Sequence, residues 1–152
     1  MKKKIFIFTF WLMVLTNCGF SPIYKNMKDL NFGISVIGIS GDREMYNLIK
    51  SNLNKYANID NSNIFKITIN TNYSKNILAK DSTGKTTDYQ IKVISNFKIE
   101  QKEFTKNISI EETFDYKKIE DLFEEKKYEE TIKQNISDIT TRKLISQLTR
   151  LQ

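Results

Sequence analysis

The chain has 152 residues, enough for one domain with a proper core but not for two. Apolar residues make up 39% and charged residues 28%, a balance typical of a globular chain and not of a disordered one. Half of the net charge of +6 comes from three lysines at positions 2–4, so the rest is too weakly basic to predict a nucleic-acid-binding surface. Histidine is absent and cysteine occurs once, which excludes Cys/His metal sites and Ser-His-Asp or Cys-His catalysis.

The first seventeen residues have the layout of an export signal. Lys2, Lys3 and Lys4 precede an apolar stretch, residues 5–15, that is interrupted only by Thr9. As a helix this stretch would span roughly 16 Å, about half of the hydrocarbon thickness of a bilayer. It is too short for a comfortable membrane span, so we predict that residues 1–17 are a signal peptide.

The segment that follows this stretch resembles the bacterial lipobox. Leu15-Thr16-Asn17-Cys18-Gly19 has an aliphatic residue three positions before the cysteine, although Asn17 departs from the usual small residue. The resemblance implies that Cys18 is lipidated and begins the mature protein, and Gly19 after it favours sorting to the outer membrane. The alternative is an uncleaved signal anchor with an incidental cysteine.

Residues 18–31 contain the sole proline, Pro22, and no sustained period, which predicts a lipidated N-terminus and tether. A single domain is expected from residue 32 to residue 152. Residues 32–39 alternate as in a strand, and Gly41 and Asp42 then offer a helix start. Apolar residues recur at helical spacing over residues 45–56, and a polar, turn-prone stretch follows.

Three more alternating segments predict half-buried strands at residues 65–73, 89–99 and 104–114. The short polar stretch 100–103 predicts a hairpin between the last two, whereas residues 74–88 are expected to form a long basic connection. One side of these strands is apolar. The other side is polar and carries Lys66, Asn70, Asn72, Lys92 and Asn96.

Helical periodicity returns from about residue 119 and continues to the C-terminus, with an expected break at the charged run 124–127. The glutamates at positions 124, 125, 129 and 130 are interpreted as solvated charge. The order strand, helix, three strands, helix favours an α+β two-layer sandwich. Two helices are expected on one face of a four-stranded, mostly antiparallel sheet.

The residues after the lipobox resemble those of a known family. Cys18-Gly19-Phe20-Ser21-Pro22-Ile23-Tyr24 looks like the Cys-Gly-Phe-x-Pro-Leu-Tyr opening of the lipopolysaccharide-assembly lipoprotein family (the LptE family) in its alphaproteobacterial form. The resemblance extends to the order of elements and to residues 138–144 near the C-terminus. It departs at Ile23, where leucine is usual, and in a final helix that contains few alanines.

The resemblance implies a non-enzymatic, cofactor-free function at the outer membrane. A member of this family plugs a large lipopolysaccharide-translocating β-barrel, supports its folding and contacts lipopolysaccharide. The polar strand side suits a polar barrel lumen, although one face of many antiparallel sheets simply contacts water. The alternative function is an accessory lipoprotein of another envelope lipid-transport system.

Three lysines of the expected connection, Lys75, Lys80 and Lys85, are candidate contacts for lipopolysaccharide phosphates, because lysine binds phosphate as a point charge. Residues 84–87 (Gly-Lys-Thr-Thr) imitate the end of a P-loop. We interpret that match as accidental, because position 79 is alanine and a strand pattern follows where a helix should begin.

Overall fold

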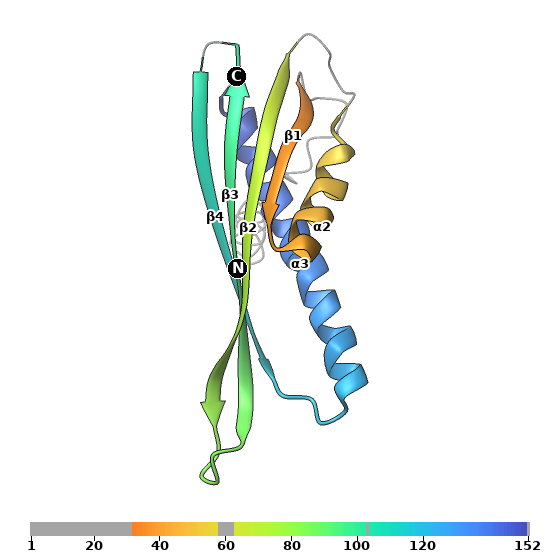
Figure 1. Ribbon diagram of the computed structural model, residues 1–152, viewed down its shortest axis with the longest axis vertical. Helices are drawn as coiled ribbons and strands as arrows, with labels where there is room; N and C mark the ends of the chain where they lie inside the picture. The colour runs from red at the N-terminus through yellow and green to blue at the C-terminus, as the bar shows by residue number, and fades with distance from the viewer. Residues whose placement is uncertain (1–31, 58–62, 103, 152) are drawn as a thin grey trace, which may run out of the picture.

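The computed structural model describes residues 32–57, 63–102 and 104–151 (Figure 1). The signal peptide, Cys18 and the tether therefore lie outside the described residues. The elements follow the predicted order of strand, helix, three strands and helix. They are β1 (Gly33–Gly41), α2 (Arg43–Asn54), β2 (Ile64–Lys80), β3 (Thr86–Gln101), β4 (Phe104–Lys117) and α3 (Leu122–Thr149).

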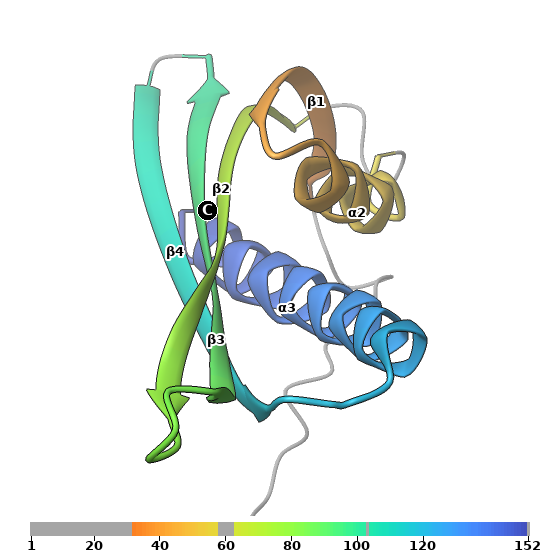
Figure 2. The same ribbon diagram turned by 60° about the horizontal axis from the view of Figure 1, so that its bottom comes forward.

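The four strands form one sheet in the order β1-β2-β3-β4. β1 pairs with β2 in parallel, whereas β2 with β3 and β3 with β4 are antiparallel. Both helices lie against the same face of this sheet (Figures 1 and 2). The predicted α+β two-layer architecture, with a mostly antiparallel sheet, is confirmed.

The junction between β1 and α2 depends on two residues. Gly41 has φ +90°, and a Cβ atom there would come within 1.9 Å of the Thr71 carbonyl oxygen of β2. Only glycine fits such a close approach. Asp42 follows as the N-cap, and its carboxylate accepts a hydrogen bond from the Met45 amide at 2.9 Å. The helix start predicted at these residues is confirmed.

Two apolar clusters fill the space between the sheet and the helices, and small polar residues separate them. Thr71 and Ser95 are cross-strand partners on the helix-facing side of β2 and β3. Thr140 of α3 lies between Ile136 of one cluster and Leu144 of the other. Ser95 and Thr140 are fully buried, and their hydroxyl oxygens have no hydrogen-bond partner among the described residues. The buried polar side chains of Thr71, Ser95 and Thr140 thus interrupt the apolar packing between the two clusters.

The unpaired hydroxyl of Thr140 predicts that an apolar substitution there raises stability. Thr140→Val removes a buried, unpaired hydroxyl, so we expect the free energy of unfolding to rise by about 1 kcal/mol in urea denaturation. Thr141→Val is the matched control, because the buried Thr141 hydroxyl donates to the Ser137 carbonyl at 2.8 Å. That variant should lose stability by a similar amount. Equal effects of the two substitutions would contradict this assignment.

The prediction that residues 74–88 form a long connection is wrong. β2 continues to Lys80 and β3 begins at Thr86, so the two strands form one long hairpin. The turn is fixed by Asp81, whose carboxylate accepts hydrogen bonds from the Thr83 and Lys85 amides, and by Gly84 at φ +84°. The alternation fades along this end of β2 because most of its side chains are exposed, so no apolar period marks the strand.

The expected break in the last helix is also wrong. α3 runs without interruption from Leu122 to Thr149, and the charged run 124–127 forms its first turns. Asp121 caps it by accepting from the Phe123 and Glu124 amides. Acidic residues are favourable at a helix N-terminus, so the run starts the helix instead of breaking it. Leu122 and Phe123, the apolar residues that begin this helix, are 78% and 74% exposed.

Candidate functional site

The face of the sheet opposite the helices is the main candidate interaction surface. No helix among the described elements covers it (Figure 2). Alternate residues of β2, β3 and β4 point to this side, in register across the three strands. We call it the open face. Its residues are Lys66, Thr68, Asn70, Asn72, Ser74, Lys92, Ile94, Asn96, Lys98, Glu100, Thr105, Asn107, Ser109, Glu111 and Thr113.

The five polar residues predicted for this side all lie on the open face. Its centre is a shallow hollow of about 410 Å³ that is lined by side chains of β2, β3 and β4. Asn70 and Asn96 are direct cross-strand partners there, and Ser109 continues the same row on β4. Amides and hydroxyls both donate and accept hydrogen bonds. Phe97, Lys98 and Ile108 also line the hollow, so it offers a partner hydrogen-bonding groups, one charge and apolar atoms.

The charges on the open face are largely paired with one another. Lys92 contacts Glu111 at 2.7 Å, and Lys98 contacts Glu100 at 2.6 Å. Exposed ion pairs of this kind contribute little stability, so a partner can replace them at small cost. The open face thus carries ion pairs that a partner can replace, together with several side-chain amides.

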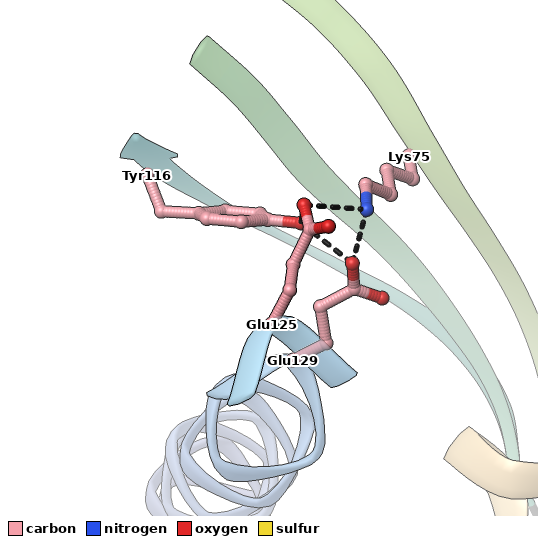
Figure 3. Close-up of polar contacts among 4 residues, drawn as sticks. All are labelled: Lys75, Tyr116, Glu125 and Glu129. Carbon is pink, nitrogen blue, oxygen red and sulfur yellow. Dashed lines mark hydrogen bonds and ion pairs between the residues drawn. The ribbon is translucent and has the colours of Figure 1, made fainter. Parts of the chain in front are cut away.

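Lys75 does not reach outward as the sequence analysis expected. It continues the helix-facing side of β2 beyond Thr71 and Tyr73, and its ammonium points at the first turns of α3 (Figure 3). There it contacts Glu125 at 3.3 Å and also Glu129. The Tyr116 hydroxyl donates to Glu129 at 2.6 Å. We call these four residues the clasp, because they tie the long hairpin and the end of β4 to α3.

The clasp was missed because Glu125 and Glu129 were interpreted as solvated. Glu125 is instead 6% exposed. The signal that could have located the clasp is the strand period itself, since positions 71, 73 and 75 share one side of a continuous strand. Accepting β2 beyond Tyr73 would have placed Lys75 opposite the helix.

Electrostatics inside the clasp favour the charged pair. Burial disfavours ionisation of Glu129, but hydrogen bonds from Lys75 and Tyr116 outweigh burial and lower its pKa. Burial also opposes the charge on Lys75, yet its interactions with Glu129 and Tyr116 raise its pKa above the ordinary value. Burial, together with the hydrogen bond to Glu129, raises the pKa of Tyr116. The lysine and Glu129 therefore remain charged and Tyr116 remains a donor near neutral pH.

The other two candidate lysines lie farther along the hairpin. Lys80 ends β2 and Lys85 closes the turn, where its ammonium contacts Glu120 at 3.1 Å with both side chains exposed. Lys75 is five residues from Lys80 along β2, a separation of roughly 16 Å in an extended strand. The hairpin thus brings Lys80 and Lys85 together at its tip and leaves Lys75 apart from them.

The fold does not support a P-loop at residues 84–87. Gly84 and Lys85 belong to the hairpin turn, and Thr86 and Thr87 begin β3, so no helix follows as a P-loop requires. Over residues 32–57, 63–102 and 104–151, no group of acidic, cysteine or histidine residues could hold a metal ion. None of the helices in those ranges is long and apolar enough to span a membrane.

From the clasp we expect a specific dependence of the free energy of unfolding on pH. Glu129 has a folded-state pKa below its unfolded value of about 4.3, so its contribution is present above that pH and is lost as the pH falls through the folded-state pKa. Lys75→Met should lower the free energy of unfolding at pH 7 by about 2 kcal/mol, because two carboxylates are left without their cation. It should also flatten the loss of stability between about pH 5 and pH 2.

Lys80→Met is the matched control, since it removes the same charge from the same strand outside the clasp. We expect this control to stay within about 0.5 kcal/mol of wild type, as exposed substitutions usually do. Urea denaturation across this pH range measures both effects. Parallel pH profiles for Lys75→Met and wild type would contradict the assigned role of the clasp.

Comparison with known proteins identifies the fold. No family model matches the chain, and no curated protein sequence matches it. Among solved structures, rare lipoprotein B from Shewanella oneidensis is similar, with a TM-score of 0.56 and 13% sequence identity. The match covers 77% of this chain and 98% of that one. At this identity the likeness shows a shared fold.

Proposed function

We propose that this protein is an outer-membrane lipoprotein that plugs a lipopolysaccharide-translocating β-barrel, supports the folding of that barrel and so assists lipopolysaccharide assembly. The observation that carries this proposal is the agreement between two independent features. One is the segment from Cys18 to Tyr24, which resembles the opening of the LptE family. The other is the shared fold with rare lipoprotein B, which belongs to that family.

The open face is the surface that we assign to the barrel. A barrel wide enough to hold a domain has a polar interior, so the plug must present amides, hydroxyls and exchangeable charges. The hollow lined by Asn70, Asn96 and Ser109 provides them. The lipid on Cys18 would tether the domain to the same membrane, because several acyl chains on one cysteine hold a protein durably.

Lys80 and Lys85 are the residues that we assign to lipopolysaccharide phosphates. They project at the tip of the long hairpin, and the exposed ion pair of Lys85 with Glu120 can be exchanged for a phosphate. Lys75, the third candidate, has its ammonium engaged by two carboxylates of the clasp. We therefore assign Lys75 to holding the hairpin in position.

Co-purification tests the barrel assignment. The tagged full chain should retain a large outer-membrane β-barrel protein from detergent-solubilised membranes. An inner-membrane transporter in its place would support the alternative of another lipid-transport system. Retention of neither would contradict both lipoprotein functions.

Binding of purified lipopolysaccharide tests the hairpin tip. The double variant Lys80→Glu/Lys85→Glu should bind about tenfold more weakly or worse, because two attractive charges become repulsive. The control Lys55→Glu/Arg142→Glu makes the same change in net charge at exposed positions of the helical layer. Unchanged affinity in the first variant, or an equal loss in the control, would contradict a specific role for the tip.

A further inference from the structure

The outer edge of β4 is a long strand edge with no partner among the described residues. β4 is the last strand of the sheet, and its register with β3 runs from Phe104 to Lys117 without a bulge. Such an edge presents a row of unpaired backbone N–H and C=O groups, which can pair with another strand. The opposite edge, β1, is shorter and its register shifts between Val36 and Gly38. The β4 edge is therefore the better surface for strand addition.

The residues of β4 are arranged almost symmetrically about Ser109. The segment reads Phe-Thr-Lys-Asn-Ile-Ser-Ile-Glu-Glu-Thr-Phe from Phe104 to Phe114. Two antiparallel copies of this segment, paired at Ser109, would bring each position opposite its counterpart across the centre. Because the counterparts lie an even number of residues apart, each residue meets one on its own side of the sheet.

On the helix-facing side the counterparts are chemically complementary. Ile108 would meet Ile110 of the other copy, and Lys106 would meet Glu112, whose carboxylate also contacts Lys143 of α3 at 2.5 Å. Phe104 would meet Phe114, and these aromatics are 38% and 37% exposed although they share the side of the sheet that holds the core. Opposite charges and aromatic pairs directly across an antiparallel pair are stabilising. A second β4 would cover the two phenylalanines that the helices leave uncovered.

The open-face side is complementary too. Thr105 would meet Thr113, and Asn107 would meet Glu111, whose carboxylate can accept the amide hydrogen. No like charges would face each other in this register. A register shifted by one residue at either copy would place helix-side residues against open-face residues.

We propose that the outer edge of β4 binds the β4 edge of a second copy of this chain, antiparallel and centred on Ser109, so that two sheets join into one of eight strands. The contact is isologous, because the same surface serves both copies. It is independent of the proposed function and would apply to the chain before a barrel partner binds it. It closes an aggregation-prone edge with a partner that the chain itself supplies.

A cysteine at the centre of symmetry tests the contact directly. In Ser109→Cys the two introduced thiols lie opposite each other, at a Cα separation that a disulfide accepts. Mild oxidation of the full chain in detergent should give a disulfide-linked dimer, at least about tenfold more than in wild type, which carries only Cys18. Asn96→Cys is the matched control, since it is exposed on the same row of the open face but one strand away from the edge.

Charge reversal tests the register. In Lys106→Glu two glutamates would face each other at both symmetric sites. Because Glu112 contacts Lys143 of α3 at 2.5 Å, the opposite reversal is made as Glu112→Lys/Lys143→Glu, which keeps an ion pair with α3 while two lysines face each other at the dimer contact. Each variant alone should be monomeric by light scattering while its circular dichroism stays that of wild type. An equimolar mixture should recover the dimer, because a heterodimer restores an opposite pair at both sites.

Two results would overturn the proposal. One is a wild-type chain that is monomeric at all accessible concentrations, with no more cross-linking from Ser109→Cys than from Asn96→Cys. The other is a dimer that both Lys106→Glu and Glu112→Lys/Lys143→Glu leave intact. That result would assign the contact to a different surface.

Discussion

The burial of a single face of the sheet is the constraint from which the other features follow. Strand side chains alternate between the two faces, and both helices return to the same one. Apolar residues therefore concentrate on that face, and the other carries mainly amides, hydroxyls and charges, of which four are paired. Burial of apolar area on one side supplies the stability of the fold, and the opposite side is free to specialise in recognition.

The same one-sided arrangement explains why the long hairpin needs a clasp. β1 pairs with β2 only from Ile64 to Thr71, and beyond Ser74 most side chains of β2 are exposed. There Lys75, Tyr116 and two glutamates of α3 replace part of the missing apolar contact with charge-assisted hydrogen bonds. The tip that carries Lys80 and Lys85 is thus held at a defined place relative to α3.

The sequence predicted the layers, the order of elements and the open-face residues, because strand and helix periods are strong where one side is buried. It failed where burial is weak. The end of β2 lacks alternation since its side chains are exposed, and the charged start of α3 was taken for a break although its acids suit a helix N-terminus. The clasp was missed for the same reason: Lys75 and Glu125 meet only when both elements are extended to their full length. The lipidation of Cys18 stays a prediction.

We assign the open face, and not the helical face, to the contact with the barrel partner. A photo-crosslinking amino acid placed at Asn96, on the open face, and at Lys126, exposed on α3, compares the two faces in intact cells. The account predicts that position 96 cross-links to a large outer-membrane barrel protein and that position 126 does not. Cross-links to that protein from position 126 alone, or equally from both positions, would contradict it.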